Sequence, residues 1–321
     1  MQDRRENQRS IKKAVSIAGI GLHTGVQTRM TFKPAAQNTG IRFLRTDVPN
    51  AKPIPADIDH VVDISRGTTL EHNGSRIHTT EHVLAAISGL EIDNILIELD
   101  NKEPPVMDGS AIPFVDILLD AGFEEQEAAR EYLVLDKTIT YSDPDKGVDI
   151  HALPSNQFRV TFLIDYKLQS LGTQYMSFYS LEQDFVEQIA PARTFCFLHE
   201  VEELKAQGLI KGGSADTALV MIDRKIEESE LSRLQKLFNI DEKLIQSENG
   251  ILNGKELRSK TEPVRHKILD LIGDLALLGM PIQGHITAAR SGHASNVELV
   301  RLLKKEYEKQ ILAKRFQRRP R

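Results

Sequence analysis

The chain has 321 residues, of which 40% are hydrophobic and 27% are charged, a balance typical of a globular protein with enough chain to bury a core. Its formal net charge of −5 excludes a general attraction to nucleic acid and leaves at most a peripheral contact with an anionic membrane. A single cysteine, Cys196, excludes an internal disulfide or a cysteine-rich zinc cluster and fits a reducing compartment.

The start of the chain shows no pattern of a targeting segment. Residues 1–13 are polar, and no stretch approaches 18 consecutive apolar residues. We therefore expect neither a signal peptide nor a transmembrane helix, and we expect a cytoplasmic location.

The first half of the chain predicts strands followed by helices. Strand-like runs separated by turn signals lie at residues 13–17, 26–32, 40–44 and 94–98. Helical patterns lie at residues 80–88 and 112–120. This half is therefore predicted to be an α+β unit, in which helices pack on a sheet.

The helix at 80–88 carries two side chains that can do chemistry. Thr79 or Thr80 can cap its N-terminus, which places Glu81 and His82 in the first turn. Adjacent helical residues point about 100° apart, so one can ligate a metal while the other holds a water, as in the H-E-x-x-H zinc proteases. The alternative is a plain helix start, in which Glu81 favours the helix dipole and His82 packs in the core.

The second half repeats the order of the first. Its strand-like runs lie at residues 132–141, 148–152, 159–165 and 284–290, and its helical patterns lie at 264–278 and from 296 onward. Strands, a histidine-bearing helix, a strand, a glycine turn and a helix thus occur twice, which predicts an internal duplication. We place the first domain at 1–125, the second at 131–321, and a linker in the acidic stretch 124–131.

Three segments of the second half have no counterpart in the first. Residues 194–220 predict an insert of strand, helix and strand, and residues 223–248 predict an exposed, strongly charged helical excursion. The basic tail, residues 304–321, holds eight lysines or arginines against two glutamates. This tail is a solvated helix end, a contact with a membrane surface, or a linker to a domain fused downstream.

One face of the helix at 264–278 is polar. His266, Asp270 and Asp274 are spaced i, i+4 and i+8, so they stack along that face, and the opposite stripe is apolar. If the helix is packed on both sides, buried carboxylates beside a histidine need a cation to satisfy them. A bound metal is one answer, and a polar face turned to solvent is the alternative.

The two helices together predict a catalytic metal site. His82, His266 and Asp270 supply two imidazoles and a carboxylate and leave a fourth position open, as in catalytic zinc sites, where the pKa of the bound water falls to roughly 7. Glu81 would then be the general base. His293, in a glycine turn before a helix capped by Ser295, is the candidate acid, and Asp274 is placed to keep it protonated.

Several motifs, in order from about residue 12 to residue 303, resemble the UDP-3-O-acyl-N-acetylglucosamine deacetylases, a family of zinc amidases in lipid A biosynthesis. The motifs are Gly19-Ile20-Gly21-Leu22-His23-Thr24-Gly25, Thr80-Glu81-His82, Met107-Asp108-Gly109-Ser110, Ala192-Arg193-Thr194-Phe195, Gly212-Gly213-Ser214, His266-Lys267-x-x-Asp270 with Gly273-Asp274, and Ser291-Gly292-His293.

The resemblance implies a fold and a set of roles. The fold is α+β, with two duplicated domains, helices packed on a sheet in each, and the active site between them. The family's zinc ligands fall on His82, His266 and Asp270, its base falls on Glu81, and its acid falls on His293, oriented by Asp274. Thr194 of the R-T-F motif would donate to the oxyanion, and Lys267 would hold substrate or the developing charge.

The resemblance also implies that the insert forms an apolar passage for the acyl chain. The residues that would line it are Phe195, Leu198, Val201, Leu204, Leu209, Ile210 and Gly213. Simple packing of the insert helix is the alternative for each of them. Two departures from the family are the length of the 223–248 excursion and the pair Asp216-Thr217, where an asparagine-like residue is expected. Some family members carry a C-terminal dehydratase domain, so a fused or partner dehydratase is a further expectation.

The leading hypothesis is hydrolysis of the N-acetyl group of UDP-3-O-acyl-N-acetylglucosamine, a small-molecule substrate, with release of acetate. This is the committed step of lipid A synthesis for the Gram-negative outer membrane. The expected cofactor is Zn²⁺, with Fe²⁺ as the alternative ion. Two other hypotheses are a non-haem Fe(II) enzyme, because two histidines and a carboxylate also suit that ion, and a non-catalytic module that binds a sugar nucleotide or a lipid.

Overall fold

Two five-stranded sheets with the same strand order form the framework of the chain. The computed structural model describes residues 5–65, 67–166, 168, 171–214, 217–223, 226–238, 250–252 and 255–317. The first sheet has the order β2 (Val15–Ile20), β3 (Gln27–Pro34), β9 (Ile95–Leu99), β4 (Ile41–Arg45) and β5 (Ile54–Pro55). The second has the order β12 (Ile139–Asp143), β13 (Val148–Leu153), β19 (His285–Ala289), β14 (Arg159–Asp165) and β15 (Thr173–Phe178).

The directions of the strands match between the two sheets, as does their order. The central strand of each sheet, β9 or β19, runs antiparallel to one neighbour and parallel to the other. The flanking pairs β2–β3, β4–β5, β12–β13 and β14–β15 are all antiparallel. The predicted duplication of an α+β unit is therefore confirmed.

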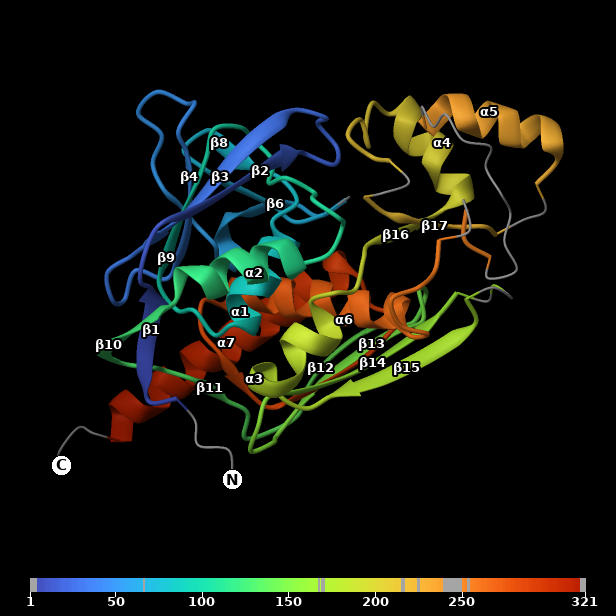
Figure 1. The fold of residues 1–321 in the computed structure, drawn as a ribbon. Helices are drawn as coiled ribbons and strands as arrows, with labels where there is room; N and C mark the ends of the chain where they lie inside the picture. Colours follow the sequence, from blue (N-terminus) through green and yellow to red (C-terminus); the bar gives the residue numbers. More distant parts are fainter. Residues whose placement is uncertain are drawn as a thin grey trace.

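Helices lie between the two sheets (Figure 1), and one hydrophobic core cluster contains apolar side chains of both halves. They are α1 (Glu81–Gly89), α2 (Ile112–Ala121), α6 (Glu262–Leu275), extended by the 3₁₀ turn η3 (Ala276–Leu278), and α7 (His293–Gln317). Helix α1 packs against α6, and α6 packs against β14 and β15. A Cβ on Gly273 of α6 would lie 2.2 Å from the carbonyl oxygen of Glu81, so glycine permits this close approach of the two helices.

Several short elements were not predicted from the sequence. They are β1 (Asn7–Ile11), β5, η1 (Ile58–His60), β6 (Val61–Asp63), β7 (Thr69–His72), β8 (Ser75–Ile77), β10 (Phe123–Ala129), β15, α3 (Leu181–Asp184), η2 (Phe185–Ile189) and β18 (Ile282–Gln283), whereas β11 (Leu133–Val134) lies within a predicted strand. Strand β11 pairs with β18 in parallel, so the strand expected at 132–141 is divided into β11 and β12. Strands β1, β10 and β18 depend on partners that are distant in sequence, which local patterns do not reveal. Strands β6, β7 and β8 pair with near neighbours instead.

The predicted linker is one of these strands. Residues 123–129 form β10, which pairs antiparallel with β1 at the start of the chain, so most of the predicted linker is a paired strand. The acidic sequence of β10 lacks the alternation of apolar and polar residues that marks a strand. Its pairing with β1 stabilises the strand instead. The domain boundaries at 125 and 131 stay a prediction.

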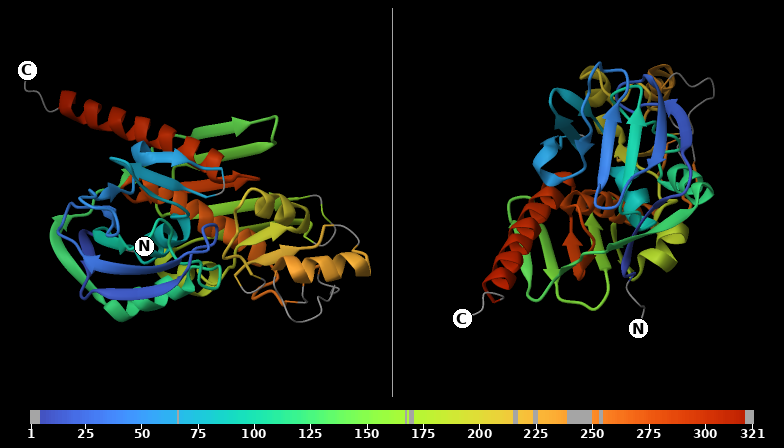
Figure 2. Two further views of the ribbon diagram at one scale, coloured as in Figure 1. Left: turned by 90° about the horizontal axis from the view of Figure 1, so that it is seen from above. Right: turned by 90° about the vertical axis from the view of Figure 1, so that its left-hand side faces the viewer.

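The insert has the predicted order of strand, helix and strand. Strand β16 (Phe195–Phe197) pairs in parallel with β17 (Leu219–Met221), and α4 (Leu198–Ala206) lies between them in the chain. Helix α5 (Glu228–Phe238) belongs to the charged excursion, of which residues 224–225 and 239–248 lie outside the described residues. Figure 2 shows the insert projecting to one side of the two sheets.

Among the described helices, none has the length and apolar character needed to cross a membrane.

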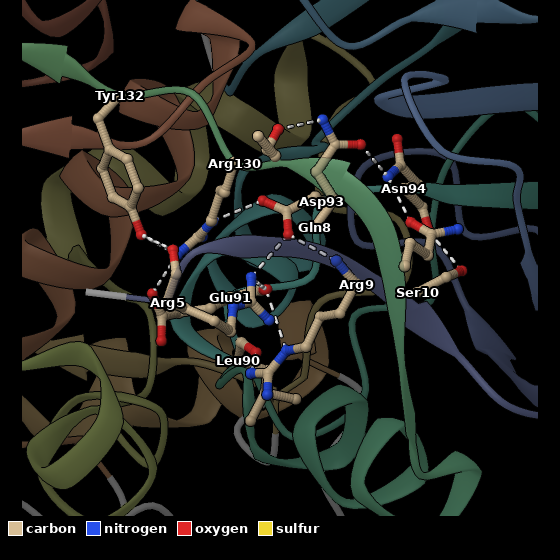
Figure 3. Close-up of polar contacts among 12 residues, drawn as sticks. Arg5, Gln8, Arg9, Ser10, Leu90, Glu91, Asp93, Asn94, Arg130 and Tyr132 are labelled. Carbon is tan, nitrogen blue, oxygen red and sulfur yellow. Dashed lines mark hydrogen bonds and ion pairs between the residues drawn. The ribbon is translucent and has the colours of Figure 1, made fainter. Parts of the chain in front are cut away.

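Three arginines tie the start of the chain to the end of α1 (Figure 3). Arg5 and Arg9 come from the N-terminal segment and Arg130 follows β10. Arg130 binds Glu91 Oε1 at 2.5 Å and Asp93 Oδ1 at 2.7 Å, while Arg9 donates to the carbonyl of Leu90, the residue that caps α1. These groups border a cavity of about 1130 Å³ at the C-terminal ends of α1 and α6, which the predicted active-site residues do not line.

Candidate active site

Helix α1 presents Glu81 and His82 from its first turn, as predicted. Thr80 occupies the N-cap position, but its side chain makes no capping hydrogen bond to the helix. The Thr80 hydroxyl donates to the carbonyl of Thr68 at 3.0 Å instead, and its backbone N–H donates to the same oxygen. Thr79 donates to Glu103. The start of α1 is therefore fixed by the segment that precedes β7, a tertiary contact that no local capping pattern reveals.

His82 from α1 converges with His266 and Asp270 from α6. Nε2 of His82 lies 3.7 Å from Asp270 Oδ1, and Nε2 of His266 lies 3.3 Å from the same oxygen. One ligand atom from each of the three residues lies within 4.8 Å of the others, and all three side chains are buried. The structure therefore brings the predicted ligand set together across the two halves of the chain.

The charge state of this set fits a divalent metal. Burial lowers the pKa of His82 to about 3 and also lowers the pKa of His266, so both imidazoles are neutral, as ligation requires. Nδ1 of His266 donates to the carbonyl of Ala192 at 3.0 Å, which leaves Nε2 free to ligate. Burial alone would raise the pKa of Asp270, but Lys267 and the nearby histidines together outweigh it and the pKa is lowered. Two neutral imidazoles and a carboxylate are a donor set of catalytic zinc sites.

Glu81 and His293 face each other beside the ligand set. Oε1 of Glu81 lies 4.0 Å from Nε2 of His293. Burial raises the pKa of Glu81 to about 7, which suits a general base near neutral pH. Burial opposes the charge on His293, but Asp274, whose Oδ2 accepts from His293 Nδ1 at 2.8 Å, outweighs it and raises the pKa of His293 to about 10. The pair therefore combines a proton acceptor with a charged proton donor.

The surroundings of His293 differ from the prediction in one respect. Helix α7 begins at His293, three residues earlier than expected. Ser295 therefore lies within the first turn and does not cap the helix. Its hydroxyl exchanges hydrogen bonds with the N–H and the carbonyl of Gly292.

Lys267 contacts one ligand residue, and Thr194 lies in a segment that contacts another. Nζ of Lys267 lies 2.9 Å from Asp270 Oδ2. Burial alone would lower the pKa of Lys267, but Asp270, Tyr166 and Asp274 together outweigh it and the pKa is raised. The backbone of Thr194 is held on both sides, because its N–H donates to Gly109 and its carbonyl accepts from Leu219. The segment that holds Thr194 also presents the Ala192 carbonyl to His266. The oxyanion role of Thr194 stays a prediction.

The predicted passage residues occupy two different environments. The ring of Phe195 lies 6.3 Å from that of His266 and 5.7 Å from Lys267 Nζ, so it belongs to the site. Leu198 and Val201 are fully buried in a separate core of the insert, against which Ile210 packs. Leu204 is buried, whereas Leu209 and Gly213 are partly exposed. For Leu198 and Val201 the structure shows packing, and a passage along this insert stays a prediction.

Sequence reasoning missed a buried ion pair behind the site. Nε of Arg193 donates to Glu262 Oε1 at 2.8 Å. Glu262 lies in the first turn of α6, is fully buried and also accepts from the backbone N–H groups of Arg193 and Arg258. The pair fixes the 192–194 segment against the helix that carries His266. A glutamate before Pro263 is equally typical of an ordinary helix start, so its sequence held no distinctive signal.

Comparison with known proteins gives a family match over most of the chain. The model described as "LpxC: UDP-3-O-acyl N-acetylglycosamine deacetylase" matches residues 8–238 and 225–305. A Chlorobaculum tepidum protein named "Bifunctional enzyme LpxC/FabZ" is 51% identical over 312 residues, which cover 97% of this chain and 67% of that protein. A Myxococcus xanthus protein named "UDP-3-O-acyl-N-acetylglucosamine deacetylase" is 41% identical over 295 residues, which cover 92% of this chain and 85% of that protein.

Proposed function

We propose, because this chain belongs to the UDP-3-O-acyl N-acetylglycosamine deacetylase family, that it hydrolyses the N-acetyl group of a UDP-3-O-acyl-N-acetylglucosamine and releases acetate. The observation that carries the proposal is the buried set of His82, His266 and Asp270 beside the facing pair Glu81 and His293. Amide hydrolysis needs these parts together: a polarised carbonyl, a base for water and an acid for the leaving nitrogen.

The proposed metal is Zn²⁺, held by His82, His266 and Asp270, with Fe²⁺ as the alternative ion. When bound, such an ion supplies Lewis acidity toward a carbonyl and lowers the pKa of water. Glu81 accepts a proton from the attacking water while the oxygen of that water bonds to the acetyl carbon. Thr194 and Lys267 stabilise the negative charge that develops on the carbonyl oxygen. His293, kept protonated by Asp274, donates to the nitrogen as the C–N bond breaks.

The setting of the reaction is part of the proposal. We place the enzyme in the cytoplasm, at the committed step of lipid A synthesis, with at most peripheral contact with a membrane. Three of the curated relatives are named as bifunctional LpxC/FabZ enzymes, which supports a dehydratase as a fused or separate partner. The basic tail would be the linker to the dehydratase domain. Residues 318–321 of that tail lie outside the described residues.

Metal content and acetate release, measured on one purified sample with UDP-3-O-acyl-N-acetylglucosamine, test the proposed function. About one zinc ion per chain together with acetate release would support it. Metal without acetate release would contradict it and favour a different N-acyl substrate or the Fe(II) enzyme, which dioxygen dependence would reveal. Neither metal nor turnover would favour the non-catalytic binding module.

Replacing His293 with alanine should remove the alkaline limb of the pH–rate profile. The wild-type rate should rise as Glu81 loses its proton, with a pKa of about 7, and fall as His293 loses its proton, with a pKa of about 10. The variant has no imidazolium to lose, so its slower rate should stay level at high pH. The measurement is kcat/KM across the pH range, and an unaltered bell-shaped profile would contradict the role of His293.

A further inference from the structure

Thr68, the residue that precedes β7, touches both halves of the proposed proton-transfer machinery. It is fully buried. Its backbone N–H donates to Glu81 Oε2 at 2.9 Å, and its hydroxyl donates to Asp274 Oδ1 at 2.8 Å. Its carbonyl accepts two hydrogen bonds from Thr80, at the start of α1. One residue of the first half thus binds the base, the helix that carries the base, and a carboxylate of the second half.

These contacts determine which oxygen of each carboxylate remains available. With Oε2 of Glu81 held by Thr68, Oε1 is the oxygen that faces His293. Gly67 leaves room beside that oxygen, because a Cβ there would lie 2.7 Å from Oε1, and the backbone of Gly67 has a φ of +136°, which favours glycine. The environment of Glu81 is therefore shaped on one side by Thr68 and on the other by the absence of a side chain.

Both carboxylate oxygens of Asp274 accept hydrogen bonds from other side chains. Oδ2 accepts from His293 Nδ1 at 2.8 Å and from Asn296 Nδ2 at 2.9 Å, while Oδ1 accepts from the Thr68 hydroxyl. Asp274 is fully buried, so water cannot replace a lost donor without a rearrangement. Removal of the hydroxyl would free the carboxylate to rotate about its side-chain bond and would change the direction in which it holds His293.

We propose that Thr68 is a positioning residue for deacetylation, which holds the base Glu81 and the acid pair Asp274–His293 in one fixed geometry. The inference rests on the proposed function. The hydrogen bonds of Thr68 go to the base, to Asp274 and to Thr80 at the start of α1, and it has no proton to give or take in the reaction, so its effect is on orientation. Loss of comparable orienting contacts lowers activity roughly 10- to 100-fold.

The variants Thr68→Val and Thr68→Ser separate the hydroxyl from the shape of the side chain. Thr68→Val keeps the volume and the backbone N–H bond to Glu81, and we expect kcat to fall roughly 10- to 100-fold with KM and metal content unchanged. Thr68→Ser restores the hydroxyl and should recover most of the lost kcat. A wild-type kcat in Thr68→Val, or no recovery in Thr68→Ser, would overturn the proposal.

Thr69→Val is the matched control. Thr69 is also buried, and its hydroxyl lies 3.1 Å from His78 Nδ1, away from Glu81 and Asp274. The Thr69→Val substitution removes an equivalent hydroxyl from the adjacent position, and the kcat of this variant should equal that of the wild type. A loss in Thr69→Val as large as that in Thr68→Val would show a general effect on stability and would also overturn the proposal.

A double-mutant cycle tests the route of the effect. If the Thr68 hydroxyl acts through Asp274 on His293, then Thr68→Val should cause no further loss of kcat in a His293→Ala background. Full additivity of the two losses would mean that the hydroxyl acts elsewhere, and the assignment would fail.

One readout is independent of turnover and separates this inference from the proposed function. The proton on His293 Nδ1, hydrogen-bonded to a buried carboxylate, should give a downfield NMR resonance that Thr68→Val shifts and Thr69→Val does not. If the wild type released no acetate, the proposed function would fail, and the resonance alone would decide the geometry. A resonance that Thr68→Val leaves in place would contradict the positioning of His293 through Asp274.

Discussion

Replacing Glu81 with glutamine is expected to lower kcat by roughly 10²–10⁴ while leaving the metal content unchanged. Glutamine has nearly the same shape, and its carbonyl oxygen can still accept the hydrogen bond that the Thr68 N–H makes at 2.9 Å. It cannot accept a proton from water at neutral pH. Because Glu81 is not one of the three side chains that converge as ligands, the metal should remain bound.

A comparison with His82→Ala makes this result specific. That change removes an imidazole from the ligand set, so the zinc content measured by elemental analysis should fall together with activity. The purified Glu81→Gln variant should therefore be inactive although it contains metal, whereas the His82→Ala variant should be inactive because it has lost the metal. Near-normal acetate release by Glu81→Gln, or stoichiometric zinc in His82→Ala, would show that the two roles are wrongly assigned.

Replacing Arg130 with methionine is expected to lower the free energy of unfolding by about 3 kcal/mol, the lower end of the range for breaking a buried ion pair. The Arg130 side chain is only 5% exposed and binds Glu91 and Asp93. The lower end applies because Arg5 still binds Asp93 at 2.6 Å, and because the Glu91 side chain is 24% exposed. Denaturant unfolding of the variant measures the change.

Arg301→Met is the control for the Arg130 experiment. Arg301 pairs with Glu298 on the surface of α7, and both side chains are 43% exposed. Exposed pairs of this kind contribute at most about 1 kcal/mol. Equal losses in the two variants would contradict the view that the arginine cluster of Figure 3 stabilises the fold through burial.

The contribution of Arg130 should also depend on pH. Burial alone would raise the pKa of Glu91, but Arg130 outweighs it and the pKa lies below its ordinary value. The pair therefore contributes fully above the pKa of an unfolded glutamate, about 4.3, and its contribution is lost as the pH falls through the lower pKa of the folded state. The difference in unfolding free energy between wild type and Arg130→Met should shrink in acid, and a constant difference would contradict the pairing.

The sequence by itself determined the features that depend on local spacing. The interval of four residues between His266 and Asp270 places both on one face of a helix whatever surrounds it. The repeated order of strands and helices predicted two matching sheets for the same reason, because periods of 2 and 3.6 residues are properties of the backbone. The partnership of His82 with this helix required the duplication and the family motifs in addition.

The tertiary structure alone decided which distant residues complete the site. Thr68 and Asn296 meet at Asp274, although 206 and 22 residues separate them from it, and Glu262 meets Arg193 from 69 residues away. Strand β10 is ordered by β1, more than 100 residues earlier. Leu198 and Val201, for which the sequence left both a passage lining and simple packing open, fill a core of the insert. Such pairings depend on which surfaces the packed helices and sheets bring together, and residue spacing along the chain carries no record of them.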